Sequence, residues 1–143
     1  MAAGTIHQID ELADYPSGRY GYVSKLRISG VGNLDTSGLT TELQSQLVHI
    51  NSATSPIGSG WGIAGHQQLV PNYDGSILLI DGDGGESVFE KAEGANYFMA
   101  PGDFSRLYQE ADGTYRRVLT DQTVYDFNPN LQLRAIVDRN GNT

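Results

Sequence analysis

The chain has 143 residues, including 18 glycines, 8 tyrosines and no cysteine, and its formal net charge is −8. This length allows one domain or slightly more, and the absence of cysteine excludes disulfides and thiolate metal sites. The negative charge argues against nucleic acid or an anionic membrane as the main partner, because such partners are bound through clusters of lysine and arginine.

Residues 19–29 alternate in polarity, which predicts a half-buried strand with four apolar side chains on one face: Tyr20, Tyr22, Leu26 and Ile28. The preceding segment, YPSGRY, resembles a tyrosine corner, in which a tyrosine near a strand start bonds to backbone a few residues upstream. Residues 30–41 are a loop by composition. Residues 42–51 fit either a helix or a strand, and the β-branched Val48 and Ile50 favour the strand.

From Ser55 onward the chain is rich in glycine. SPIGSGWGIAG surrounds the only tryptophan, Trp61, and its glycines predict a tight crossing of two backbone segments. Turns spaced by about 8–12 residues then favour an all-β meander of antiparallel hairpins, forming a sheet or a partial barrel. Further strands are expected at 77–80, 87–91, 96–100, 105–110, 114–120, 123–128 and 131–138.

One unit of this pattern recurs. DGSILLIDGDGGESVFEK and DGTYRRVLTDQTVYDFN each contain Asp-Gly-Ser or Asp-Gly-Thr, a strand, a short polar turn and a second strand. A unit of this kind cannot bury its own face and needs stacked neighbours. In the last predicted strand, alternation places Leu131, Leu133, Ala135 and Val137 inward.

These stretches carry a family resemblance. From Ser55 onward the chain resembles the region that opens the β-sheet shell of bacterial Rhs/YD-repeat proteins, and the matching stretches are SPIGSGW, GIAGHQQLVP, DGSILLIDGDGG, APGDFSRL, ADGTYRRVLTDQTVYDFN and LQLRAIVDRNGNT. Residues 1–52 look like the last two strands of an immunoglobulin-like module. The expected organisation is therefore an immunoglobulin-like strand pair at 1–52, followed by an Rhs/YD-like sheet region at 53–143.

The chain departs from the family pattern at one turn. Leu131 stands where the usual repeat has glycine, so we expect a wider turn there, or one built around Pro129. The final DRNGNT contains Asn-Gly, a strong signal for a type I′ hairpin turn. In the family this stretch is followed by the first strand of the next repeat, so the chain is expected to be a fragment cut at a repeat boundary.

The acidic stretch DGDGGE is the best candidate for a bound ion. Asp81, Asp83 and Glu86, with backbone carbonyls, would supply oxygen ligands of the kind that calcium prefers. The stretch does not follow the EF-hand spacing, and a soluble glycine-rich turn is the favoured explanation. Trp61 and Tyr73 are candidates for stacking on sugar rings, although aromatic residues along strands are commonly core residues.

No nucleophile-base set or paired-histidine spacing is visible in the sequence, so no catalytic residue and no obligatory cofactor are expected. The resemblance implies a structural segment of a large secreted or cell-surface bacterial protein, whose shell encloses or carries a C-terminal effector. Its partners would be other segments of that shell, with strand-mediated self-association at open edges. The alternative is an extracellular module that binds carbohydrate or an adhesion partner, with or without calcium. No membrane span is expected, since no apolar run approaches roughly 18 residues, and any signal peptide would lie outside this segment.

Overall fold

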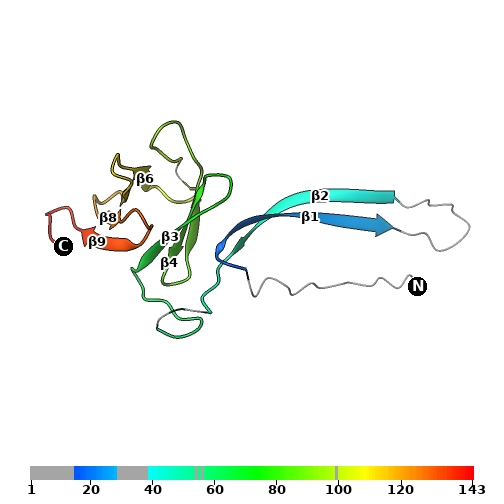
Figure 1. The fold of residues 1–143 in the computed structure, drawn as a ribbon, viewed down its shortest axis with the longest axis horizontal. Helices are drawn as coiled ribbons and strands as arrows, with labels where there is room; N and C mark the ends of the chain where they lie inside the picture. Colours follow the sequence, from blue (N-terminus) through cyan, green and yellow to red (C-terminus); the bar gives the residue numbers. More distant parts are fainter. Residues whose placement is uncertain (1–14, 29–38, 54, 56, 99) are drawn as a thin grey trace, which may run out of the picture. The chain divides into compact units, whose positions relative to one another are not determined.

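The computed structural model describes residues 15–28, 39–53, 55, 57–98 and 100–143. The chain divides into two compact units, Met1–Asn51 and Ser52–Thr143. The described residues form β-strands and no helix, which confirms the predicted all-β antiparallel class (Figure 1). The strands make sheets of two, three and four strands, and none of these described sheets is closed into a barrel.

The first unit contains an antiparallel ribbon of β1 (Gly18–Ile28) and β2 (Leu39–His49). The predicted strand at 42–51 is confirmed, whereas most of the loop predicted at 30–41 lies outside the described residues. Tyr22, expected on a half-buried face, is 46% exposed. A ribbon of two strands cannot by itself bury a face, and this explains the exposure.

The hydrogen bond expected of a tyrosine corner is present at the start of β1. The Tyr20 hydroxyl donates to the carbonyl of Pro16 at 2.7 Å, and the Tyr15 ring packs edge-on against the Tyr20 ring at 5.6 Å. The backbone N–H of Asn51 donates to Ser17 Oγ at 2.9 Å, which ties the segment before β1 to the segment after β2. Whether this ribbon belongs to an immunoglobulin-like module remains a prediction.

The second unit contains the two larger sheets. The first has the order β3-β4-β5, made of β3 (Gln67–Pro71), β4 (Ile77–Asp81) and β5 (Glu86–Phe89). The second is a meander in chain order, made of β6 (Arg106–Gln109), β7 (Tyr115–Val118), β8 (Val124–Phe127) and β9 (Leu133–Val137). Isolated bridges link the two sheets. One joins Gln68 of β3 to Gln132, just before β9. Two others, Lys91↔Tyr97 and Asn96↔Tyr108, link the end of β5 to β6 through the segment between these strands.

The strand predicted at 96–100 is wrong, because its described residues form only isolated bridges. The Tyr97 N–H donates to the carbonyl of Leu107 beside β6, whereas the next N–H, that of Phe98, donates to the carbonyl of Glu90 beside β5. Successive N–H groups of an extended segment face opposite edges, and here each edge is held by isolated bridges and not by a continuous ladder. This segment joins the edges of the two sheets.

One hydrophobic core lies between the two sheets. Each sheet contributes to it: Leu69, Ile77, Leu79 and Phe89 come from the three-stranded sheet, and Leu107 and Phe127 from the four-stranded sheet. Tyr97 and Ala100, from the linking segment, complete the cluster. The core therefore depends on both sheets, as expected for hairpins that cannot bury their own faces.

The second unit repeats one turn geometry six times. In each turn the first N–H donates to the fifth carbonyl, the fourth N–H donates to the first carbonyl, and the fourth residue has a positive φ. This is a type I turn followed by a left-handed residue in a G1 bulge. The turns span 72–76, 81–85, 110–114, 119–123, 128–132 and 138–142.

Two turn predictions are corrected by this geometry. Leu131 does not widen its turn, because it adopts the left-handed conformation itself, with φ 64°. The Asn140-Gly141 turn is not type I′, because Gly141 has a positive φ and Asn140 does not. Both segments therefore fold into the same turn as the Asp-Gly turns.

A bulge shifts the pairing of β9 with β8. Phe127 pairs with Leu133 but Asp126 pairs with Ala135, so Arg134 is an extra residue on this strand. Leu131 and Leu133 pack against the core, as predicted. Beyond the bulge Ile136 pairs with Tyr125, yet burial follows the predicted alternation, because Ala135 and Val137 are half-buried and Ile136 is exposed.

Candidate functional site

The residue pair with the most unusual environment is Gln67 and Asp81, which lie opposite each other at the start of β3 and the end of β4. Gln67 Nε2 donates to Asp81 Oδ2 at 3.0 Å. The two remaining oxygens, Gln67 Oε1 and Asp81 Oδ1, are buried and have no hydrogen-bond partner among the described residues. Gln67 is only 3% exposed. Buried polar atoms are normally hydrogen-bonded, so two unpaired acceptors in one cross-strand pair need an explanation.

The structure separates the three carboxylates that the sequence suggested for calcium. Asp81 belongs to β4, Asp83 lies at the tip of the following turn, and Glu86 pairs with Ile80, one residue out of phase with Asp81. Asp83 Oδ1 accepts the N–H of Gly85 at 2.9 Å, a bond that shapes the turn. Across the described residues, no three His, Cys, Asp or Glu side chains are grouped so that they could hold a metal ion.

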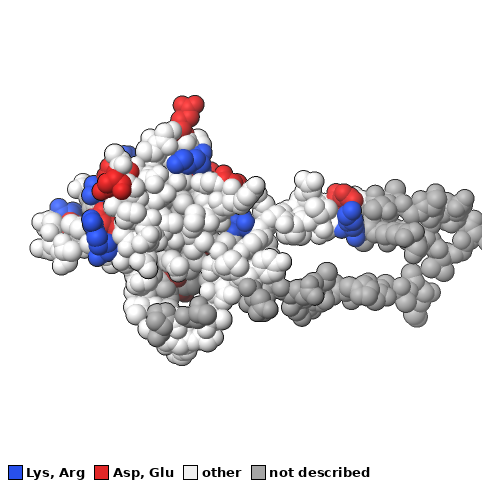
Figure 2. Space-filling model, in the orientation of Figure 1, with Lys and Arg blue, Asp and Glu red and all other residues white. Residues whose placement is uncertain are grey.

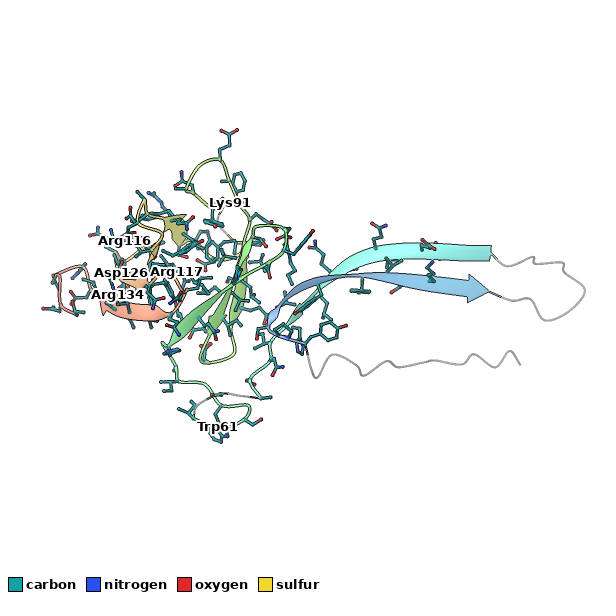
Figure 3. The ribbon with its side chains drawn as sticks, viewed as in Figure 1. Trp61, Lys91, Arg116, Arg117, Asp126 and Arg134 are labelled. Carbon is teal, nitrogen blue, oxygen red and sulfur yellow. The ribbon has the colours of Figure 1, made fainter. Side chains whose placement is uncertain are left out.

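Trp61 and Tyr73 lie on segments at opposite ends of β3. Trp61 is 71% exposed in the loop before this strand, where its carbonyl accepts a hydrogen bond from Ser55 Oγ at 2.7 Å (Figure 3). Tyr73 is fully exposed in the turn after the strand. Each side chain is available for contact, but the two belong to different loops and do not form one platform.

The predicted backbone crossing is present beside this loop. A Cβ on Gly62 would lie 2.2 Å from the carbonyl oxygen of Gly82, and one on Gly82 would lie 1.8 Å from the carbonyl oxygen of Ile63. Only residues without a side chain allow the two segments to come this close. The crossing places the loop after Trp61 directly against the end of β4, next to Asp81.

A second polar cluster lines an open groove of about 580 Å³. Arg117 donates from Nη2 to Asp103 Oδ2 and from Nε to Ser105 Oγ, each at 2.8 Å, and its guanidinium lies 5.9 Å from the centre of the Tyr125 ring. Arg117 and Ser105 are both buried. The groove is bordered by Glu86, Ser87, Phe104, Leu119 and Asp121.

This cluster holds the loop before β6 onto β7. Burial by itself would raise the pKa of Asp103, but hydrogen bonds from Ser105, together with the charge and hydrogen bond of Arg117, outweigh it and lower the pKa below the usual value. Asp103 therefore stays ionised and paired at neutral pH. The sequence offered no signal for this cluster, because its members are 12 and 14 residues apart along the chain.

Charged side chains on the four-stranded sheet form a cross-strand network. Asp126 accepts from Arg116 Nε at 2.8 Å and lies 4.0 Å from Arg134 Nη2, while Glu110 lies 3.4 Å from Arg116 Nη1 (Figure 3). Hydrogen bonding to Asp126 is the main cause that raises the pKa of Arg116. Positive and negative side chains lie next to one another in this way on the face shown in Figure 2, which has no extended region of positive charge.

The chain matches no family model, no curated protein and no solved structure. The residues described by the structure include no helix with the length and apolar character that a bilayer crossing requires. Evidence for a function therefore comes from the geometry of the chain and not from similarity to known proteins.

Proposed function

We propose that the chain is a non-catalytic structural segment of a larger, Rhs/YD-like β-sheet shell. In this proposal the larger protein is a secreted or cell-surface bacterial protein, and its shell encloses or carries a C-terminal effector. The observation that supports the proposal best is the repetition of one turn geometry six times in the second unit. A uniform turn suits a chain whose role is to extend a sheet by successive hairpins.

The sixth turn, at 138–142, reverses the chain beside the open edge of β9. The N–H of Asp138 donates to the carbonyl of Asn142 at 2.9 Å, which is the first ladder bond of a hairpin. Backbone groups alternate between the two edges of a strand, so the N–H and C=O of Ile136 face the same edge as those of Asp138. Apart from the single bridge between Gln68 of β3 and Gln132, which lies just before β9, no described strand pairs with that edge. In the proposal a further strand pairs there.

The side chains on β9 agree with an added strand. Ile136 is opposite Tyr125, which packs against the core, yet Ile136 is 39% exposed. An apolar residue at a sheet edge is covered when another strand is added beside it. The proposed neighbour would therefore place an apolar side chain against Ile136.

Hydrogen exchange tests this proposal directly. We would compare the chain with a version extended after Thr143 by a short Thr/Tyr-rich strand, and measure exchange at individual amides by NMR. The expected result is that the Ile136 amide exchanges rapidly in the chain and becomes protected in the extended version. The amides of Arg117 and Tyr125, within the meander, serve as internal controls because they are protected in both.

A matched extension with proline at alternate positions provides the control variant, because proline cannot donate to a ladder. It should leave the Ile136 amide unprotected. If the Thr/Tyr extension also leaves Ile136 unprotected, or if the proline version protects it equally, the β9 edge does not extend the sheet and the proposal fails.

A second candidate function is an extracellular module for carbohydrate or an adhesion partner. The observation in its favour is the exposure of two large rings on loops, Trp61 at 71% and Phe104 at 73%. Exposed aromatic rings are enriched at binding surfaces. A glycan array probed with the chain and with Trp61→Ala and Phe104→Ala variants tests this function, and binding lost in either variant would support it.

A further inference from the structure

The two unpaired oxygens of Gln67 and Asp81 belong to one small region of the second unit. They come from cross-strand partners, whose side chains share a face of the sheet. One hydrogen bond, from Gln67 Nε2 to Asp81 Oδ2, already fixes the two side chains against each other. The other two oxygens, Gln67 Oε1 and Asp81 Oδ1, are both acceptors, and no described residue donates a hydrogen bond to either of them.

Two buried acceptors in one cross-strand pair, one of them on a carboxylate, can be satisfied by a species of positive charge. A neutral amide oxygen and a carboxylate oxygen are ligands that hard cations prefer, and calcium in particular accepts six to eight oxygens in flexible geometry. The close crossing of Gly62 and Gly82 brings two further carbonyl oxygens, those of Ile63 and Gly82, next to the residue that follows Asp81.

We propose that Gln67 and Asp81, together with carbonyl oxygens of the Gly62–Gly82 crossing and water, bind a calcium ion. Of the three carboxylates in DGDGGE, only Asp81 takes part. Asp83 makes the same bond to the fifth residue of its turn that Asp74, Asp112 and Asp121 make in theirs, so its position needs no ion. Glu86 pairs with Ile80, and adjacent residues of a strand point to opposite faces, so its side chain is turned away from that of Asp81.

The site has one carboxylate, so its affinity should be low. Extracellular calcium modules bind with dissociation constants of about 0.1–1 mM, and we expect this range or weaker. At 10 mM calcium such a site would be largely occupied. A ligand that binds the folded chain and not the unfolded chain raises the melting temperature.

The test uses calcium itself with the full chain. Isothermal titration and thermal melts in 10 mM CaCl₂ or 1 mM EDTA would be compared for the natural chain and for Asp81→Asn. We expect a rise of a few degrees with calcium in the natural chain and none in Asp81→Asn. The variant should still fold, because the asparagine amide can donate to Gln67 Oε1 and so replaces the ion.

Asp83→Asn and Asp112→Asn are the matched controls, since both aspartates bond to the fifth residue of an identical turn. Both should keep the calcium response of the natural chain. The proposal is overturned if calcium gives no heat and no shift in the natural chain, in which case a buried water satisfies the two oxygens. It is equally overturned if Asp83→Asn removes the response as fully as Asp81→Asn does. Neither result bears on the β9 edge, which the hydrogen-exchange experiment tests separately.

Discussion

Gln122 should be a site where glycine stabilises the chain. It is the fourth residue of the 119–123 turn, is exposed and has φ 70°, a conformation that four of the six turns assign to glycine. A non-glycine residue in the left-handed region costs about 1–2 kcal/mol, and glycine loses about 0.5–1 kcal/mol more conformational entropy on folding. Gln122→Gly should therefore raise the free energy of unfolding by about 0.5–1 kcal/mol. For the 92 residues of Ser52–Thr143, this corresponds to a few degrees in melting temperature.

Leu131 is the matched control, because it has nearly the same φ, 64°, but a different environment. Its side chain packs against the core, so Leu131→Gly relieves the same backbone strain and loses apolar contacts. Truncating a buried leucine costs about 2–5 kcal/mol, and half that for a half-buried one still exceeds the relief. Urea unfolding followed by circular dichroism should give opposite signs for the two variants. If Gln122→Gly is neutral or destabilising, backbone strain at this position has been misjudged.

Three further variants, with Gly21→Ala as a control, test the crossing and the ion pair of Arg117 and Asp103. Gly82→Ala should destabilise the second unit by about 3 kcal/mol or more in a urea titration, since the added Cβ would lie 1.8 Å from a carbonyl oxygen. Gly21→Ala, whose Cβ would have no atom within 4 Å, should change stability little in the same titration. Arg117→Met should cost about 3 kcal/mol by removing the cation that pairs with the half-buried Asp103 carboxylate, and calorimetry showing no loss would contradict the role of this pair. The pKa of Asp103 is lower in the folded chain than in the unfolded chain. The ionised carboxylate therefore contributes fully to the free energy of unfolding above about pH 4, and this contribution is lost as the pH falls through the folded-state pKa. Asp103→Asn should therefore be less stable than the natural chain at pH 7, and unfolding measured from pH 7 to pH 2 should show the difference shrinking in acid.

The sequence predicted the fold class because its signals are local. Asp-Gly turns mark the ends of hairpins at 72–76 and 110–114, and alternation identifies β1 and β8. The turn at 128–132 was misjudged, because Leu131 adopts the conformation that glycine would favour and a leucine gives no signal for it. β3 gave no clear strand pattern, since it begins with two glutamines and ends with proline.

The candidate site was only half visible in the sequence. Asp81 was identified because acidic residues cluster in DGDGGE, but the same cluster drew attention to Asp83 and Glu86, which the strand register separates from it. Gln67 could not have been found, because glutamine is an ordinary surface residue and nothing in the sequence distinguishes Gln67 from Gln68. Its role depends on burial and on a pairing across 14 residues, which only the three-dimensional register specifies.

The uniform turn has a consequence for how such a chain can change over evolutionary time. Each reversal is closed by two backbone bonds and a side-chain bond within five consecutive residues, without help from distant segments. A stretch of gene coding for one hairpin can therefore be copied or deleted in frame, and the flanking reversals still close. Proteins assembled in this way are expected to differ in length by whole hairpins.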